Sequence, residues 1–264
     1  MTAFTALLDR WWQEYTGLCP QADLVARHLR AAGQPVVFDH VTFRTFSHPA
    51  ISIELLASAF TAHGYRMQAE YDLPTRRLWG RHFAPPAGEL PRVFLSELLA
   101  HRYSEDLRLG MRRLADHVPP ERRAGPALVD GARPWALTHE EYLRLADESP
   151  YAAWVAAFAF RPHHFALSLN HLHGFGHIGD FNRWLRDRGI PLDERGGEIK
   201  GSPGTYLESS ATTVATVDAC FSDGVYRVPG SHCEFVWRHP LPDGQLYDGF
   251  PEHVAHHPEV RTGG

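Results

Sequence analysis

The sequence predicts an α+β fold built from two modules with the same order of elements, strand–helix–strand–strand–strand. Two observations indicate this order. Short stretches alternate between apolar and polar residues with the period of a strand, and in each module one helical stretch separates the first strand from the other three. We expect the modules to form a curved, partly open barrel with added helices. The repeat is one of element order, without obvious sequence identity.

The 264 residues suit a single domain with five parts. These parts are N-terminal helices (1–34), a first module (35–100), a helical spacer (101–160), a second module (161–240) and a polar, His-rich tail (241–264).

The first module begins with a strand at 36–46, in which alternation places His40, Thr42 and Arg44 on one face. A helix at 51–63 ends at Gly64, and strands follow at 65–71, 76–83 and 92–98. The spacer contains a helix at 104–117 and a capping box at 138–141. In the second module we expect strands at 164–173, 205–210, 213–219 and 231–238, with a helix at 180–188.

Composition excludes several classes of function. The formal charge is −5, from 26 Lys and Arg against 31 Asp and Glu, and basic blocks are lacking, which argues against nucleic acid as a partner. No stretch approaches the roughly 20 apolar residues of a membrane span. Three scattered cysteines do not form a disulfide framework, so we expect a reducing, cytoplasmic location. The oligomeric state is left open.

Histidine is abundant, with 18 in the chain. His40 and His171 lie on the first strands of the two modules, and Glu234 lies on the last strand of the second. Two imidazoles and one carboxylate are the facial set that binds Fe(II) and leaves positions open, although other divalent ions also fit it. Each residue could instead be an ordinary hydrogen-bonded strand residue. His171 and His173 also have the spacing of paired cupin ligands, but no Glu follows as a cupin needs.

Three separated segments, in this order, resemble the 2-oxoadipate dioxygenase/decarboxylase family, which is related to the vicinal-oxygen-chelate fold. They are Phe38-Asp39-His40-Val41-Thr42-Phe43-Arg44-Thr45-Phe46, Asn170-His171-Leu172 and Val228-Pro229-Gly230-Ser231-His232-Cys233-Glu234-Phe235. The resemblance spans about residues 36–238. It implies a vicinal-oxygen-chelate-like open barrel and an Fe(II)-dependent enzyme that uses O2.

The resemblance also implies a reaction and roles for named residues. The substrate would be a small 2-oxo acid, converted by oxidative decarboxylation to a shortened hydroxy acid. His40, His171 and Glu234 would bind the metal, and Arg44 would hold a substrate carboxylate. Arg44 lies four residues after His40, about 13 Å along the strand, so an extended acid could bridge the two. A guanidinium suits a carboxylate better than a Lys ammonium does.

The sequence departs from the family pattern in two ways. The chain is much shorter than characterised members, and Tyr206-Leu207-Glu208-Ser209-Ser210 stands where a Leu-Leu-Gln-Thr-Ser-like stretch is expected. Glu208 is therefore a candidate catalytic and substrate-binding residue that would favour an ammonium or hydroxyl group, or act in its protonated form. Alternatively, it is a solvent-facing strand residue. Ser209 and Arg238 are further candidate substrate contacts, and His232 and Arg238 candidate neighbours of the metal ligands.

Two other classes of function stay open. One is a metal-dependent isomerase, lyase or hydrolase on the same scaffold, which needs no oxygen. The other is a protein that binds a small ligand without transforming it.

Overall fold

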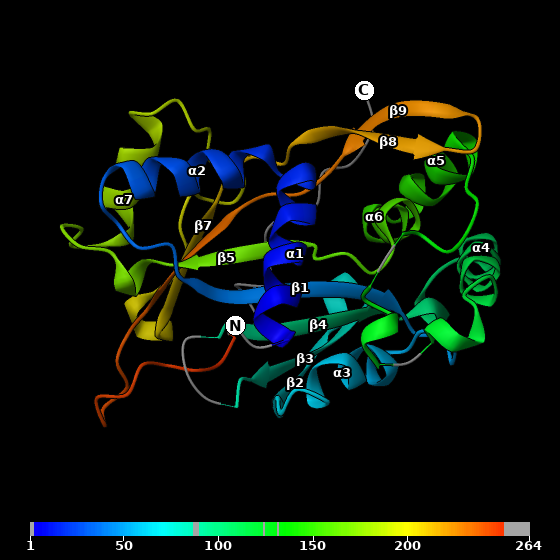
Figure 1. The fold of residues 1–264 in the computed structure, drawn as a ribbon, viewed down its shortest axis with the longest axis horizontal. Helices are drawn as coiled ribbons and strands as arrows, with labels where there is room; N and C mark the ends of the chain where they lie inside the picture. Colours follow the sequence, from blue (N-terminus) through cyan, green and yellow to red (C-terminus); the bar gives the residue numbers. More distant parts are fainter. Residues whose placement is uncertain (1–2, 87–89, 124, 131, 251–264) are drawn as a thin grey trace.

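A computed structural model describes residues 3–86, 90–123, 125–130 and 132–250. It contains one curled sheet of eight strands in the order β2-β3-β4-β1-β5-β10-β7-β6 (Figure 1). The predicted α+β fold with a partly open barrel is confirmed. The strands are β1 (Phe38–Phe46), β2 (Arg66–Leu73), β3 (Leu78–Ala84), β4 (Arg92–Leu98), β5 (His164–Ser168), β6 (Lys200–Ser202), β7 (Leu207–Ala211) and β10 (Glu234–Arg238).

The two modules meet at the centre of this sheet. In the first module β1 lies parallel to β4, and in the second β5 lies parallel to β10. The first strands of the modules, β1 and β5, pair antiparallel to each other. Each half of the sheet therefore repeats the same strand arrangement, and the two halves are related by an approximate two-fold axis between β1 and β5.

The second module differs from the sequence prediction in its last strands. Its outer strand is β6, which was not predicted. The strand predicted at 213–219 is β8 (Thr216–Phe221), which pairs with β9 (Gly224–Pro229) in a separate two-stranded sheet. Alternation reports that a segment is extended but not which sheet it joins, so this hairpin was mistaken for part of the barrel.

The helices lie on the convex face of the sheet and at its ends (Figure 1). Trp11 of the first helix contacts Phe43 of β1 with ring centroids 5.0 Å apart, and Trp12 contacts Phe165 of β5 at 5.3 Å. From His40 onward, odd-numbered residues of β1 thus face this helix and even-numbered residues face the concave side, whereas Phe38, which lies before a shift in register, contacts Trp12 of the helix. The helices are α1 (Ala3–Leu18), α2 (Pro20–Ala31), α3 (Ile53–Thr61), α4 (Glu105–Asp116), α5 (His139–Glu148), α6 (Pro150–Phe158) and α7 (Ile178–Arg186).

A local signal in the sequence predicted where α5 begins. The capping box predicted at the start of α5 is present, with Thr138 and Glu141 each accepting a backbone N–H of the other. The spacer packs as α4, α5 and α6, and α6 contributes Tyr151 to the concave side of the sheet. The tail prediction for 241–264 falls partly outside the described residues, which end at Phe250.

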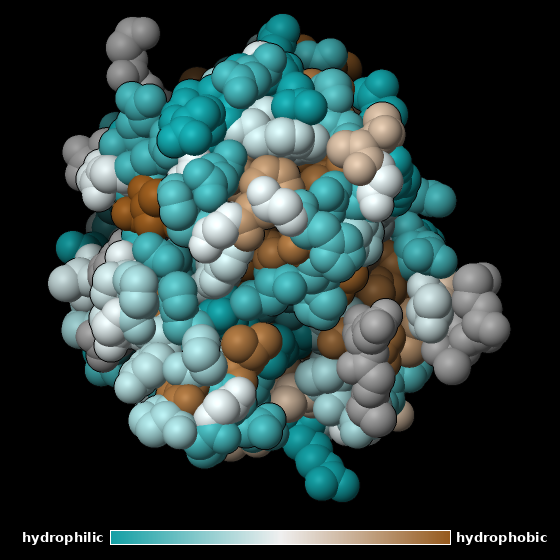
Figure 2. All heavy atoms as spheres, turned by 90° about the vertical axis from the view of Figure 1, so that its left-hand side faces the viewer, coloured by the Kyte–Doolittle hydropathy of each residue, from teal (hydrophilic) through white to brown (hydrophobic). Residues whose placement is uncertain are grey.

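The helices use their apolar faces in packing against the sheet. Among the described residues, no helix is both long and apolar enough to span a bilayer. Figure 2 shows one face of the molecule as mainly hydrophilic, with hydrophobic residues in small separate patches.

Candidate metal centre and substrate pocket

Three side chains from the three central strands meet on the concave face. They are His40 of β1, His164 of β5 and Glu234 of β10, with ligand-type atoms all within 4.8 Å of one another. The Nε2 atoms of His40 and His164 lie 3.3 Å and 3.2 Å from Oε2 of Glu234. Ligand atoms in adjacent positions on an ion with bonds of about 2.1 Å stand about 3 Å apart, so this donor set fits a divalent metal ion.

Strand register explains why these residues converge. Val41 of β1 pairs with Phe165 of β5, and the two strands run in opposite directions. His40 is the residue before Val41, and His164 is the residue before Phe165. The two imidazoles therefore occupy equivalent positions of the two modules. In the same way Thr42 pairs with Phe94 on β4, and Ala166 pairs with Glu234 on β10. Phe94 thus takes the place in the first module that Glu234 takes in the second, which leaves three ligands rather than four.

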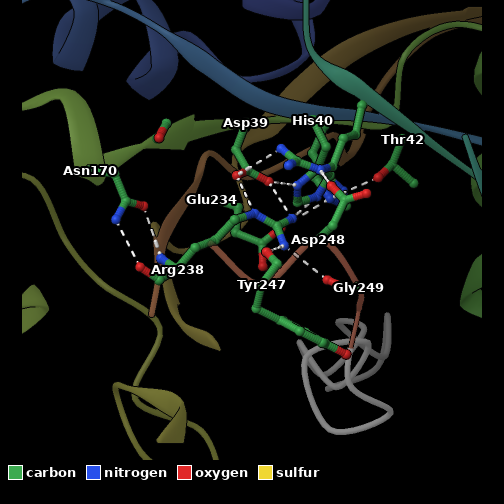
Figure 3. A network of polar contacts seen from close by, with 12 residues as sticks. Asp39, His40, Thr42, Asn170, Glu234, Arg238, Tyr247, Asp248 and Gly249 are labelled. Carbon is green, nitrogen blue, oxygen red and sulfur yellow. Dashed lines mark hydrogen bonds and ion pairs between the residues drawn. The ribbon is translucent and has the colours of Figure 1, made fainter. Parts of the chain in front are cut away.

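The predicted ligand His171 is not part of this cluster. Strand β5 ends at Ser168, and His171 lies in the 3-10 turn Leu169–His171, where its exposed ring contacts the Ser168 hydroxyl. At this turn the Asn170 side chain takes the place of a strand backbone. Its amide nitrogen donates to the carbonyl of Arg238, and its amide oxygen accepts the backbone N–H of Arg238 (Figure 3). The second imidazole of the cluster comes instead from His164, seven residues earlier.

A buried carboxylate behind His40 fixes the orientation of its ring. Nδ1 of His40 lies 2.8 Å from Oδ1 of Asp39, which can only accept, so Nδ1 carries the hydrogen and Nε2 points to Glu234. Burial alone would lower the pKa of His40, but the hydrogen bonds with Asp39 and Glu234 outweigh it and raise that pKa. The two carboxylates thus favour positive charge at His40, and the same acidic surroundings would favour a bound cation.

Burial holds two further imidazoles at the site neutral, those of His164 and His163. Burial lowers the pKa of His164 to about 4, and it lowers the pKa of His163 well below its ordinary value. Nδ1 of His163 lies 2.8 Å from Nδ1 of His164, and the ring of His232 stacks on His164 with centroids 4.9 Å apart. Neutral imidazole is the form that binds metal ions, so His164 is prepared for that role.

Arg238 joins Asp39 to the end of the described chain. Its Nε and Nη2 atoms donate to the two Asp39 oxygens at 2.6 Å and 2.9 Å, and Nη1 donates to the carbonyls of Tyr247 and Gly249 (Figure 3). Burial alone would raise the pKa of Asp39, but the Arg238 guanidinium and His40 outweigh it and hold that pKa below its usual range. The pair is therefore charged and almost fully buried.

A pocket opens from the cluster along the concave face. It encloses about 640 Å³ of empty space including its open mouth, and His40, His164 and Glu234 lie on its wall. Arg44, two positions beyond Thr42 on the same face of β1, lines the same pocket. Its guanidinium carbon lies 4.6 Å from the centre of the Tyr151 ring. Other lining residues include Arg76, Phe94, Ser96, His163, His232 and Phe250.

The remaining predicted contacts fall in other places. Glu208 pairs with Trp237, and Glu234 pairs with Ala211, so alternation puts Glu208 on the opposite face of the sheet from Glu234. There it lies 2.8 Å from Nε2 of His239. Ser209 is fully buried beside Val236 and does not line the pocket, and the Arg238 side chain is directed to Asp39. The predicted roles of Glu208 and Arg238 in substrate contact are corrected accordingly.

Sequence reasoning missed several residues that shape the site. His164, Tyr151, Phe94, Arg76 and Phe250 all line the pocket. The signal for His164 was present in the sequence, since it is the first residue of the strand predicted at 164–173, and it pairs with Thr42, two residues after His40, once the two strands are paired antiparallel.

Comparisons with known proteins give a family match and a curated relative. A family model for 2-oxoadipate dioxygenase/decarboxylase matches residues 8–119 and 131–261. A chloroplastic 2-oxoadipate dioxygenase/decarboxylase of Arabidopsis thaliana is 31% identical over 276 residues, covering 98% of this chain and 74% of the plant protein.

Solved structures are similar over almost the whole chain. A candidate hydrolase from Shewanella frigidimarina is 36% identical with a TM-score of 0.89, covering 95% of this chain and 98% of that one. Hydroxyglutarate synthase from Oryza sativa, solved with 2-oxoadipate, is 26% identical with a TM-score of 0.87, covering 96% and 89%. A candidate glyoxalase-superfamily protein from Ralstonia eutropha, 21% identical with a TM-score of 0.75, covers 93% and 84% and shows the vicinal-oxygen-chelate-like fold.

Proposed function

The chain belongs to the 2-oxoadipate dioxygenase/decarboxylase family, and we propose that it is a non-haem Fe(II)-dependent enzyme that uses O2 to convert a 2-oxo dicarboxylic acid to a hydroxy acid. The observation that carries this proposal is the shared pocket. Two imidazoles and one carboxylate lie on the same wall as the guanidinium of Arg44. In a 2-oxo dicarboxylic acid, the 2-oxo acid end suits the metal cluster and the second carboxylate suits Arg44.

The proposed reaction balances without a further reductant. 2-Oxoadipic acid and O2 together contain the same atoms as hydroxyglutaric acid and CO2 together. The bond between the first carboxylate and the 2-oxo carbon breaks, and the carboxylate leaves as CO2. One oxygen atom enters the new carboxylate at the former 2-oxo carbon, and the other enters the new hydroxyl group on the next carbon.

His40, His164 and Glu234 would hold the metal ion as a facial set of ligands. Bound Fe(II) supplies a Lewis acid for the 2-oxo acid and the electrons for reaction with O2. Asp39 keeps the hydrogen of His40 on Nδ1, so that Nε2 is the donor atom. Strands in one rigid sheet carry all three ligands, which fixes their spacing before substrate binds.

Arg44 is the residue that we assign to the distal carboxylate. Its guanidinium lies against the flat ring of Tyr151, and the planar fork of a guanidinium matches the two oxygens of a carboxylate. The Tyr151 hydroxyl is itself fixed, because it donates to the Ser96 carbonyl at 2.7 Å. An anchor at this end positions the 2-oxo acid end at the cluster through binding energy remote from the reacting atoms.

Oxygen consumption by Fe(II)-loaded protein tests the proposal. With 2-oxoadipate we expect one CO2 released for each O2 consumed, and a hydroxy acid as the product. A panel of shorter and longer 2-oxo acids, with and without a distal carboxylate, then defines the substrate. If substrate is transformed equally well in anaerobic buffer, the chain is a metal-dependent lyase, isomerase or hydrolase instead. If His164→Ala protein binds the acid as tightly as wild type does, the chain is a metal-independent binding protein.

A further inference from the structure

The last described residue, Phe250, forms part of the wall beside the metal cluster. Its ring centroid lies 4.8 Å from that of His40, 5.1 Å from that of Phe94 and 5.2 Å from that of His82. The side chain is 7% exposed and lines the pocket. A residue 16 positions after Glu234 thus reaches back to the first ligand, His40.

The backbone around Phe250 is fixed at several points. The carbonyls of Tyr247 and Gly249 accept hydrogen bonds from Arg238 at 2.8 Å and 2.9 Å (Figure 3). The Asp248 carboxylate accepts from Nε of Arg92, and the N–H of Phe250 donates to the Tyr71 hydroxyl at 3.3 Å. These anchors come from β10, β4 and β2, so the ring is set by the sheet that carries the metal ligands.

Phe94 and Phe250 form one apolar surface on the first-module side of the cluster. Phe94 stands at the position equivalent to Glu234, so this surface fills the space that a fourth ligand would take. The charged end of the pocket, at Arg44, lies farther along β1. Substrate atoms between the two ends would therefore pass beside these aromatic rings.

We propose that Phe250 is a specificity-determining residue that limits the width of the substrate next to the metal. This inference rests on the proposed function, in which a 2-oxo acid binds at the cluster and its chain runs toward Arg44. Phe250 admits an unbranched chain and excludes a branch on the carbon next to the 2-oxo group. Arg238 and Arg92 hold the segment that carries the ring.

The test compares two acids in wild-type protein, in two main variants and in one conservative variant. The acids are 2-oxoadipate and its 3-methyl derivative. The variants are Phe250→Ala, which removes the ring from the wall, and Leu246→Ala, which removes a 45% exposed side chain of the same segment that does not line the pocket. Binding to metal-loaded protein is measured by calorimetry under nitrogen, and turnover by oxygen consumption. Phe250→Leu is included as a conservative variant.

We expect the ratio of affinities, branched over linear, to rise at least tenfold in Phe250→Ala, with an intermediate rise in Phe250→Leu and no change in Leu246→Ala. Metal content should be equal in all four proteins. An unchanged ratio in Phe250→Ala protein that still loads metal would overturn this inference alone. Wild-type protein that binds both acids but consumes no O2 would overturn the proposed reaction and leave the inference standing. Wild-type protein that binds neither acid would overturn both.

Discussion

His40 and His164 occupy equivalent positions on neighbouring antiparallel strands, one residue before the paired Val41 and Phe165. An approximate two-fold axis through that pair superimposes one imidazole on the other. The same operation relates Glu234 to Phe94, so the third ligand has an apolar counterpart. The duplicated module therefore supplies two equivalent ligands and one that is unique to its second copy.

The first prediction separates the two histidines proposed for the second module. His164→Ala removes a buried donor atom 3.2 Å from Glu234, and we expect it to abolish metal binding and turnover together. His171→Ala removes an exposed ring in a turn, and we expect metal content and turnover to stay at the wild-type level. Metal content after dialysis and the rise in melting temperature on metal addition are the measurements.

The opposite pattern, metal lost in His171→Ala and kept in His164→Ala, would show that the chain binds metal at a different place. His163→Ala is a useful third variant, because it removes the neighbouring imidazole that contacts Nδ1 of His164. We expect it to weaken metal binding less than His164→Ala does.

The sequence predicted much of the fold because alternation and capping are local properties. The strand at 36–46 placed His40 and Arg44 on one face, and that face is the concave one. Glu234 was placed on the last strand of the second module, which pairs beside β5. Each of these depends on a period of two within a single strand, which does not require knowledge of neighbours.

What failed depended on contacts between distant segments. The strand predicted at 164–173 ends at Ser168, because Asn170 hydrogen bonds to the backbone of Arg238, 68 residues away. Glu208 was assigned to the pocket by analogy, but the register of β7 on β10 puts it on the other face. The role of Phe250 depends on anchors from three strands and has no local signal.

The buried ion pair behind His40 predicts a combined effect on stability and metal affinity. Asp39→Asn leaves the Arg238 guanidinium buried without its partner charge, which costs about 3–5 kcal/mol of unfolding free energy. It also weakens the hydrogen bond to Nδ1 of His40, so we expect metal affinity to fall about 10–100-fold. Urea unfolding of metal-free protein and metal titration measure the two effects.

Asp248→Asn is the matched control for that variant. Its carboxylate pairs with Arg92 but is 48% exposed, and exposed pairs contribute about 0–1 kcal/mol. A stability loss in Asp248→Asn as large as that in Asp39→Asn would contradict the view that burial of the Asp39 pair sets the effect.

Arg44→Lys tests the anchor for the distal carboxylate. Lysine keeps the charge but loses the planar fork and its contact with Tyr151. We expect KM for a 2-oxo dicarboxylic acid to rise roughly tenfold, or about 1.4 kcal/mol, while metal content is unchanged. Glu208→Gln is the control on the far face of the sheet, and we expect its substrate profile to match wild type. A changed profile in Glu208→Gln would return that residue to the site.

Arg76 and its chain neighbour Arg77 form a matched pair for testing the charge of the pocket. Arg76 lines the pocket, whereas Arg77 is exposed and its guanidinium carbon lies 4.7 Å from the centre of the Tyr103 ring. Because two guanidinium groups in one pocket attract anions, we expect Arg76→Gln to lower kcat/KM for dicarboxylic acids and to weaken its salt dependence. Arg77→Gln should keep wild-type values. Equal effects in both variants would indicate a general surface charge instead.

His82 predicts how the stability of metal-free protein depends on pH. It is 3% exposed, its Nδ1 lies 2.7 Å from the Tyr71 hydroxyl oxygen, and burial lowers its pKa to about 4. The unfolded chain, with a pKa near 6.5, binds the proton first, so His82 contributes stability above pH 6.5 that is lost as pH falls toward 4.

His82→Leu removes that dependence. Between the unfolded and the folded pKa of His82, the stability advantage of wild type over this variant should fall by about 1.4 kcal/mol for each unit by which the pH falls. His40 acts in the opposite direction, because its raised pKa gives stability that is lost as pH rises. Comparing the two proteins cancels that contribution. Urea unfolding from pH 7.5 to 4.5 in the presence of a chelator measures the slopes, and parallel curves would show that His82 has the same pKa in the folded and the unfolded chain.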